Sequence, residues 1–558
     1  MSIFKNNTIK LAVIAVVVFS LILGIVMITK NWGKNRDTID TDAAMRKLDG
    51  LYAKLNVNKQ TPKLDPDFRG NDETAEKVAV LPDIAEYPFI VNPTTDNFLT
   101  IYASPEKAEF LTQTANLFNQ SGAMAEGYPV SVGIRAIPSS LGADFIASGK
   151  YTPDLYIPAS EIYGDMLIAQ GGKARLIEKR LAGNVSGIVI AQKKHDELTK
   201  KYGALNSKTL IDCVPKGELL LGYTTPLSNE DGFNFILTLL SHYDSGNPLS
   251  ESAVENLRKF QDKTPFISYD NDQLKASLTS GSLDAIVLNY QAYQTAPNLS
   301  NYKFIPTGAR QDSPVYEIGD LSPLKKQIST DFVTFCKNAD SQGTAKEKGF
   351  GNLDEYSGES AMAGETILQA QEIYKREKNG SNDLTAVFVA DISGSMEGAP
   401  LLNLKASLNR AIGVINAEAN VGLVTFSDNV NIAVPIAKFD NNQRSYFSSS
   451  VKSMTAVGGT AMFDAVVVAQ KMLMDAKLRN PNTKLMLFVL TDGETNRGYV
   501  FKDIEKITRD LRVPVYTIGY NANIEILKEL SNINEAATMN ADSDNVIYRI
   551  ESLFNAQL

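Results

Sequence analysis

The sequence predicts an α/β protein that begins with a transmembrane helix and continues into two α/β domains. Three observations support this fold class. Residues 11–29 (LAVIAVVVFSLILGIVMIT) carry no charge and have about the length that crosses a membrane. From about residue 97, short apolar runs typical of strands alternate with segments of helical periodicity. A second alternating series follows residue 384, so the chain of 558 residues is predicted to contain two α/β domains.

The composition argues against several functional classes. A net charge of -9, without a basic cluster, disfavours nucleic acid as a partner, because phosphate binding needs a basic face. The 2 cysteines, Cys213 and Cys336, exclude a disulfide scaffold; we interpret both as buried thiols, and their pairing stays open. Neither of the 2 histidines, His195 and His242, stands in a motif for a zinc site or a serine triad.

The N-terminal region is predicted to anchor the chain. We expect a cytoplasmic tail at residues 1–9 and an uncleaved transmembrane anchor at residues 10–30, since no small-residue cleavage site follows the apolar run. Trp32 stands where an interfacial anchor residue is expected. Lysines and arginines on both sides of the span leave its orientation open. Residues 31–85 are interpreted as a stalk or linker, because the chain from Gly33 to about Lys77 is polar and charged. One short helix is expected inside it, capped by Asp42, with Met45, Leu48, Tyr52 and Leu55 near one face.

Residues 86–350 are predicted to form the first α/β domain. The segments LTIYASPEKAEFLTQTANLFNQ, GADFIASGKYTPDLYIPAS, GYTTPLSNEDGFNFILTLL and LKASLTSGSLDAIVLNYQAY resemble extracellular solute-binding proteins of the molybdate-binding type. The resemblance implies a two-lobed, periplasmic-binding-protein-like domain. Ligands of such folds lie beyond the carboxyl ends of strands, where helix N-termini offer free N–H groups.

Candidate ligand-binding residues of this domain stand at corners between a strand and a helix. Helix capping is the alternative role for each serine and threonine among them. No aromatic cage or arginine clamp in the sequence names the ligand. The candidates are Ser104, Ser139, Ser140, Thr225 with its neighbour Thr224, and Tyr290.

Residues 384–558 are predicted to form a doubly wound, Rossmann-like α/β domain, which follows a helical bridge at residues 351–383. Strands such as TAVFVAD and KLMLFVLTDG are near-continuous apolar runs, as expected of a parallel sheet covered on both faces. Asp391 and Asp492 stand at the carboxyl ends of two of these strands, where sites form in this architecture.

Five oxygen donors on three loops predict a metal site: Asp391, Ser393, Ser395, Thr460 and Asp492. Mg²⁺ prefers six oxygen ligands, and neutral hydroxyls leave much of its charge unquenched. The alternative is that these residues only form turns. The pattern DxSxS, then T, then D resembles the metal-ion-dependent adhesion site of a von Willebrand factor type A domain. The resemblance implies that the three hydroxyls bind Mg²⁺ (or Mn²⁺ or Ca²⁺), while the two aspartates act mainly through water.

The sequence therefore predicts a membrane-anchored extracytoplasmic binding protein. Its metal site is expected to bind an acidic side chain of a protein partner. The alternative is a solute receptor or sensor, in which the two-lobed domain captures a small anion or another solute. No Walker A, HExxH, GxSxG or Rossmann GxGxxG motif appears in context, so we do not expect an enzyme. Both resembled domain types are usually found outside the cytoplasm, so the bulk of the single-pass chain is expected there.

Overall fold

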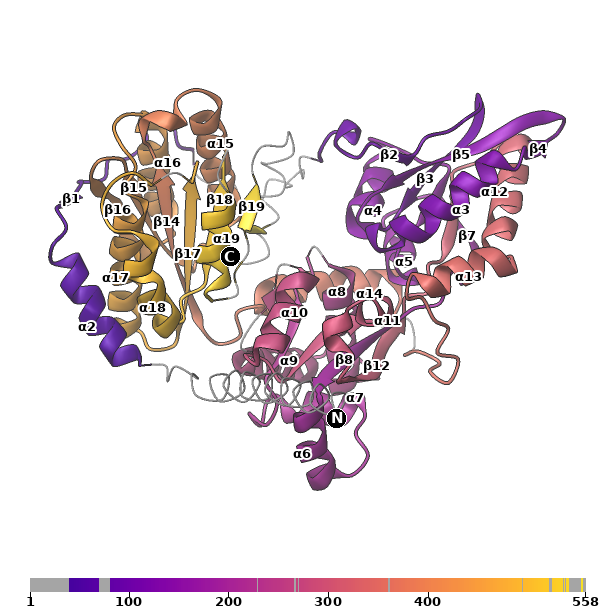
Figure 1. Cartoon of the computed structure of the whole chain (residues 1–558), viewed down its shortest axis with the longest axis horizontal. Helices are drawn as coiled ribbons and strands as arrows, with labels where there is room; N and C mark the ends of the chain where they lie inside the picture. The colour runs from indigo at the N-terminus through magenta and orange to yellow at the C-terminus, as the bar shows by residue number, and fades with distance from the viewer. Residues whose placement is uncertain are drawn as a thin grey trace, which may run out of the picture.

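The computed structural model describes residues 40–558 apart from 70–80, 228, 265–266, 269, 360–361, 494, 521–523, 535, 537, 541–552 and 555–558. The predicted cytoplasmic tail and transmembrane anchor lie outside the described residues. Within the described part of the chain, no helix is both long enough and apolar enough to cross a membrane. Three sheets organise the described residues, two in the front domain and one in the C-terminal domain (Figure 1).

The first lobe of the front domain has the strand order β2-β5-β3-β6-β13-β7, with β4 beside β5. Strands β5, β3 and β6 run parallel, whereas β2, β13 and β7 are antiparallel to their neighbours. Its strands are β2 (Phe89–Val91), β3 (Asn97–Ala103), β4 (Met124–Ala125), β5 (Tyr128–Ala136), β6 (Leu155–Ile157), β7 (Ala174–Glu178) and β13 (Val315–Ile318). Its helices are η1 (Ile84–Glu86), η2 (Pro105–Lys107), α3 (Ala108–Gln120), α4 (Ser139–Ser148), α5 (Glu161–Ala169), α12 (Pro323–Cys336) and α13 (Ala339–Glu347).

The second lobe has the strand order β10-β9-β11-β8-β12, in which β8 is antiparallel to both of its neighbours. Its strands are β8 (Val185–Ala191), β9 (Leu221–Thr224), β10 (Ile267–Ser268), β11 (Ala285–Asn289) and β12 (Tyr302–Arg310). Its helices are α6 (Gln192–Tyr202), α7 (Ser207–Cys213), α8 (Glu230–Tyr243), α9 (Glu251–Lys263), α10 (Asn271–Ser280), α11 (Tyr290–Gln294) and η3 (Pro297–Leu299). Cys213 and Cys336 are buried and unpaired, as the interpretation of two free thiols expects.

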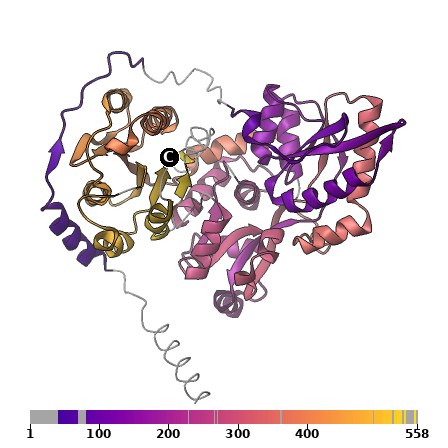
Figure 2. The same cartoon turned by 45° about the horizontal axis from the view of Figure 1, so that its top comes forward.

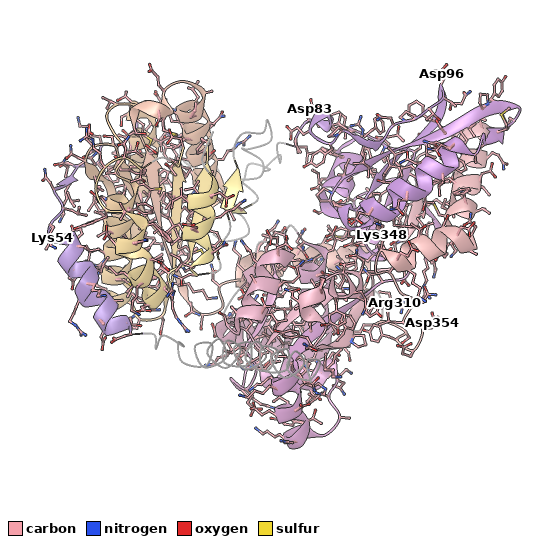
Figure 3. The ribbon with its side chains drawn as sticks, viewed as in Figure 1. Lys54, Asp83, Asp96, Arg310, Lys348 and Asp354 are labelled. Atoms are coloured by element: carbon pink, nitrogen blue, oxygen red, sulfur yellow. The ribbon has the colours of Figure 1, made fainter. Side chains whose placement is uncertain are left out.

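The two lobes share one apolar core. It contains Tyr163 from the first lobe, Phe233 from the second, and Ile367 and Tyr374 from the bridging helix α14 (Gly364–Glu377). Because α14 contributes buried side chains against both lobes, it holds them together as well as leading to the C-terminal domain. Arg310 lies on the side of the front domain that faces away from the C-terminal domain (Figure 3). It stands where the chain passes from one lobe to the other, and its guanidinium donates to Asp312 and to backbone carbonyls of the segment between β13 and α14.

The C-terminal domain is a seven-stranded sheet with the order β1-β16-β15-β14-β17-β18-β19. Strands β15, β14, β17, β18 and β19 are parallel, and β16 is antiparallel to β15. Successive residues of β14 enter different cores, with Phe388 facing α15 and α16 and Val389 facing α17 and α18. This two-sided burial explains the continuous apolar strands. Its strands from β14 onward are β14 (Asp383–Asp391), β15 (Asn420–Phe426), β16 (Val430–Lys438), β17 (Thr483–Thr491), β18 (Val515–Gly519) and β19 (Thr538–Asn540). Its helices from η4 onward are η4 (Gly394–Met396), α15 (Ala399–Val414), α16 (Asn441–Ser453), α17 (Met462–Arg479), α18 (Phe501–Leu511) and α19 (Ile524–Asn532).

Part of the segment that we interpret as a stalk or linker packs against the C-terminal domain. Residues 40–68, here called the N-terminal strap, pack along the C-terminal domain. Helix α2 (Thr41–Tyr52) lies against α17 and α18, on the side away from the front domain (Figures 1 and 2). Lys54, just beyond α2, marks this outer side in Figure 3. Strand β1 (Val57–Lys59) then pairs in parallel with β16 and extends the sheet.

Specific contacts hold the N-terminal strap in place. Leu48 is fully buried in the core with Ala44, which is why the apolar face of the predicted helix is not free in solvent. Asp65 accepts hydrogen bonds from Ser448 (2.6 Å) and Lys452 (3.0 Å), and these contacts lower its pKa to about 2. The helix was predicted, but its cap was placed wrongly. Asp40, not Asp42, accepts the hydrogen bond from the backbone N–H of Ala43.

Candidate functional site

The first candidate site lies at the carboxyl edge of the C-terminal sheet, where β14 and β17 end side by side. Asp391 is the last residue of β14 and is fully buried. Its Oδ1 accepts the backbone N–H of Ser393 (2.8 Å), and its Oδ2 accepts the hydroxyl of Thr491, the last residue of β17 (2.6 Å). These two bonds fix the carboxylate against the start of the next loop. Thr491 was not among the predicted site residues, because it reads in the sequence as one more strand residue.

The two predicted serine ligands lie together on the loop after β14. The Oγ atoms of Ser393 and Ser395 are 3.0 Å apart, with Ser393 buried and Ser395 exposed. The loop is tied to the second predicted loop, since Gly394 N–H donates to the carbonyl of Gly458 (3.0 Å). Gly458 has a φ of 84°, a left-handed conformation that favours glycine.

Thr460 is held by the third loop. Its backbone N–H donates to Oδ1 of Asn496 (3.0 Å), and its carbonyl accepts the N–H of Asn496 (3.1 Å). The side chain is almost fully buried. The three loops that carry the predicted donors are therefore joined to one another by backbone hydrogen bonds, as convergence of the donors requires.

Asp492 has an unsatisfied oxygen. Its side chain is 7% exposed, and its buried Oδ1 has no hydrogen-bond partner. Burial raises the pKa of the neighbouring Asp391 to about 6, and the negative charge of Asp492 adds to the rise. The hydrogen bonds from Thr491 and Ser393 lower this pKa and so offset part of the rise. A buried carboxylate oxygen without a donor is costly. Two carboxylates beside three hydroxyls therefore form a group that a hard cation fits, since it would neutralise the charge and satisfy the free oxygen.

The rim of this edge contains an ion pair that the sequence did not reveal. Oδ1 of Asp428, after β15, accepts the N–H of Gly459 (3.0 Å) and pairs with Nε of Arg497 (2.6 Å). In the sequence, turn formation explains Asp428 adequately. The FSDN segment at the end of a third strand was a usable signal, but nothing local pointed to its partner.

The solute-site candidates of the front domain are distributed differently. Ser139 is buried at the start of α4, where its Oγ accepts the N–H of Ala159 (3.0 Å). Ser104 and Thr225 are buried, and the hydroxyl of each has no partner, whereas Ser140 is half-buried. Tyr290 lines a pocket of about 380 Å³ with Gly183 and Phe350; none of the other four candidates lines it.

Two adjacent carboxylates that sequence reasoning missed, Glu230 and Asp231, open α8, and Glu230 contacts Ser139. Oε1 of Glu230, on the first turn of α8 in the second lobe, accepts the N–H of Ser139 in the first lobe (3.2 Å). Asp231 accepts the N–H (3.2 Å) and the Nδ2–H (2.9 Å) of Asn289, at the start of α11. Burial raises the pKa of both Glu230 and Asp231, and the negative charge of Glu106, on η2, adds to the rise.

Comparisons with known proteins assign both domains. Residues 99–351 match the family of bacterial extracellular solute-binding proteins, and residues 386–556 match the von Willebrand factor type A domain. The chain is 26% identical over 174 residues to a von Willebrand factor A domain-containing protein of Dictyostelium discoideum, covering 30% of this chain and 18% of that protein. The chain thus spans about a fifth of the length of that relative.

Two solved structures are similar to separate parts of the chain. The von Willebrand factor type A structure from Catenulispora acidiphila has 16% identity and a TM-score of 0.29, with 31% of this chain and 42% of that chain covered. The sulfate-binding protein of Mycobacterium tuberculosis has 14% identity and a TM-score of 0.33, with 46% of this chain and 88% of that chain covered. The two family matches confirm the predicted combination of a solute-binding domain with a C-terminal von Willebrand factor type A domain. Both are binding domains.

Proposed function

We propose that the C-terminal domain binds an acidic side chain of a protein partner through a divalent cation, Mg²⁺ or Mn²⁺ in preference to Ca²⁺. The observation that carries this proposal is the partnerless, buried Oδ1 of Asp492 beside a serine pair and a second buried carboxylate. Ser393, Ser395 and Thr460 would supply neutral oxygen ligands, and Asp391 and Asp492 would hold ordered water around the ion. When bound, the cation supplies a positive charge that these ligands only partly neutralise.

The surface around the proposed site supports an interaction with protein. Two large apolar side chains are exposed at this edge, Leu402 on the first turn of α15 at 67% and Val457 on the loop before α17 at 61%. Val457 directly precedes Gly458, and its N–H donates to the carbonyl of Ile392 (2.8 Å), which places it beside the serine loop. A partner segment with a carboxylate next to an apolar side chain matches both features, because interfaces combine a buried apolar contact with satisfied charges.

The test is metal titration combined with partner capture. The full-length protein is titrated with Mn²⁺, followed by electron paramagnetic resonance, and is used to capture partners from native membranes with or without EDTA. We expect one Mn²⁺ per chain and EDTA-sensitive capture. The double substitution Ser393→Ala with Ser395→Ala should remove both properties. Unchanged titration and capture in that double variant would refute the proposal.

We also propose that the chain is a single-pass membrane protein with both domains outside the cytoplasm. The uncharged run at residues 11–29 and the match to an extracellular solute-binding family support this location. Protease added to cells with permeable outer layers should remove both domains and leave a short membrane-bound fragment. Complete protection of the domains under these conditions would exclude the proposed orientation.

A second proposed function is solute capture by the front domain. It is supported by polar groups from both lobes that meet where Glu230 contacts Ser139. A thermal-shift screen of the full-length protein in EDTA against small anions and cations tests it, since a solute that binds only the folded state raises the unfolding midpoint. A screen in which no solute changes the midpoint would exclude this function.

A further inference from the structure

An ion pair joins two loops beside the proposed metal site. Oδ1 of Asp428, on the loop after β15, lies 2.6 Å from Nε of Arg497, on the loop after β17. Both side chains are partly exposed, Asp428 at 44% and Arg497 at 63%. Exposed ion pairs add little to the stability of a fold, because water and salt screen them. The main effect of this pair is therefore expected on the loops that it joins.

The backbone of Thr460 is held from two sides by these same two loops. On one side, Oδ1 of Asp428 accepts the N–H of Gly459 (3.0 Å), which directly precedes Thr460. On the other side, Oδ1 of Asn496 accepts the N–H of Thr460 (3.0 Å). The Thr460 carbonyl in turn accepts the N–H groups of Asn496 (3.1 Å) and Arg497 (3.3 Å). The ion pair closes these contacts into a ring around Thr460, because it joins the two loops that support it.

The two glycines before Thr460 allow this close approach. A Cβ atom on Gly458 would lie 2.4 Å from Oδ2 of Asp428. A Cβ atom on Gly459 would lie 2.7 Å from Nε of Arg497 and 2.9 Å from Oδ1 of Asp428. A side chain at either position would therefore require the ion pair to shift. The glycine pair that marks this loop in the sequence is thus matched to Asp428 and Arg497.

The contacts of Asp428 differ from those of a metal ligand. Its Oδ1 already accepts the N–H of Gly459 and pairs with the guanidinium of Arg497. Among the described residues, no group of three or more His, Cys, Asp or Glu side chains converges closely enough to hold a metal ion. Asp428 therefore does not join Asp391 and Asp492 as a third charged ligand.

We propose that Asp428 is a positioning residue of the metal site: it holds Thr460 through the N–H of Gly459, and Arg497 keeps the Asp428 carboxylate in place. This inference rests on the proposed function of the C-terminal domain, and it adds two residues that lie outside the pattern of five donors. Asp428 supports the loop from one side and Asn496 supports it from the other, so both are needed to present the Thr460 hydroxyl to the ion.

The expected consequence of losing Asp428 is weaker metal binding without unfolding. The N–H of Ala461 would still donate to the carbonyl of Ser427 (3.0 Å), so the loop would stay attached to the domain. The N–H of Gly459 would lose its acceptor, and the hydroxyl of Thr460 would be held less firmly. Residues that orient metal ligands in this way typically change metal affinity about 10- to 100-fold when they are replaced.

The experiment compares Asp428→Ala with the wild type in the full-length protein by two measurements. Mn²⁺ titration followed by electron paramagnetic resonance measures metal affinity. Hydrogen–deuterium exchange of the metal-free protein measures the protection of segment 456–461. We expect Mn²⁺ affinity to fall about 10- to 100-fold and the segment to exchange faster, with little change in urea unfolding.

Asp440→Ala is the matched control. Asp440 also accepts a backbone N–H, that of Gln443 (2.9 Å), at the N-cap of α16. It lies at the opposite edge of the sheet, because β16 ends beside Asn420, where β15 begins. The loss of this cap should lower stability and leave both Mn²⁺ affinity and the exchange of segment 456–461 unchanged.

Two further variants separate the hydrogen bond from the ion pair. Asp428→Asn keeps an acceptor for the N–H of Gly459 and should lose less affinity than Asp428→Ala. Asp428→Arg combined with Arg497→Asp restores an ion pair but no acceptor, so its Mn²⁺ affinity should stay low. Full recovery in this double variant would overturn the role of the Gly459 hydrogen bond.

The outcomes distinguish this inference from the proposed function. Unchanged exchange of segment 456–461 in Asp428→Ala, or unchanged Mn²⁺ affinity, would overturn the inference. The proposed function would then still stand if Ser393→Ala with Ser395→Ala removes Mn²⁺ binding. A wild-type protein that binds no Mn²⁺ would overturn the proposed function and this inference together.

Discussion

The proposed metal site at the carboxyl edge of the C-terminal sheet and the contact between the lobes around Glu230 lie at the same kind of place but differ in which polar groups are left free. Both lie where strands end and helices begin. At the proposed metal site, hydroxyls and an unsatisfied carboxylate oxygen of Asp492 are left for an outside cation. At the contact between the lobes, Glu230 and Asp231 cover the helix-end N–H groups. The same architecture thus leaves acceptors free at one place and covers donors at the other, and we propose that the two places differ in what they bind.

The largest expected effect tests whether metal binding depends only on residues at the carboxyl edge of the C-terminal sheet. Leu48→Ala in the N-terminal strap removes a fully buried side chain from the core under α17 and α18. We expect a loss of about 2–5 kcal/mol in the unfolding free energy of the C-terminal domain, with unchanged Mn²⁺ affinity in the folded state. Urea unfolding measures the first quantity, and Leu64→Ala in the same strap, at a residue 55% exposed, is the control. A matching loss in Leu64→Ala would mean that the strap does not act through burial.

The second-largest expected effect comes from a substitution in the proposed metal site. Asp391→Asn keeps the shape of the side chain but removes the charge that orders the serine loop and the ion's water. We expect Mn²⁺ affinity to fall about 10- to 100-fold, as for residues that position metal ligands. Asp383→Asn, at the opposite end of the same strand, is the matched control. Equal losses in the two variants would contradict the assignment of the site to this edge.

A smaller effect concerns the pKa of Asp231 and the pH dependence of front-domain stability. The folded-state pKa of Asp231 is about 7, above its ordinary value of 3.8, so its protonated form stabilises the fold at low pH. This contribution is complete below about pH 4 and is lost as the pH rises through 7. Asp231→Asn should therefore flatten the decline of front-domain stability between pH 4 and 7, by up to about 1 kcal/mol per pH unit. Urea unfolding across this range measures the slope, and an equally steep decline in the variant would argue against a neutral Asp231.

The smallest expected effect separates a paired hydroxyl from an unpaired one. The Oγ of Ser104 has no partner, so Ser104→Ala should change stability by less than about 1 kcal/mol. Ser139→Ala removes the acceptor of the Ala159 N–H and should cost about 1–3 kcal/mol. Chemical denaturation without solute compares the two. A larger loss in Ser104→Ala than in Ser139→Ala would show that Ser104 has a partner in solution.

The two sites were not equally predictable from sequence. The DxSxS donors and Asp492 are read from local order, because each follows a strand whose two buried faces produce a continuous apolar run. Thr460 is read from the glycine pair that precedes it at the start of a helix. The carboxylates at the contact between the lobes were missed because Glu230 and Asp231 open α8, where acidic residues are ordinary partners of the helix dipole. Only the arrangement of the lobes reveals that they are removed from water.

The N-terminal strap shows the same limit at longer range. The helical periodicity of Met45, Leu48 and Tyr52 predicted a helix, and the structure contains α2. Its packing partner was not predicted, since the face that it covers belongs to α17 and α18, more than 400 residues later in the chain. Neither local propensity nor composition contains information about a partner so distant, whereas polarity alone favoured a free stalk.

The position of the N-terminal strap also determines the order in which parts of the C-terminal domain are synthesised and can fold. Helix α2 ends at Tyr52, and its first partner helix, α17, begins at Met462. At a synthesis rate of about 5–20 residues per second, the apolar face of α2 is made roughly 20–80 s before a partner exists. During that interval the whole front domain is produced and can fold before the rest of the C-terminal domain exists. The domain that carries the proposed metal site therefore completes its fold only when the N-terminal strap meets α17 and α18. Until then, the nascent chain must keep the exposed leucines of α2 from aggregating.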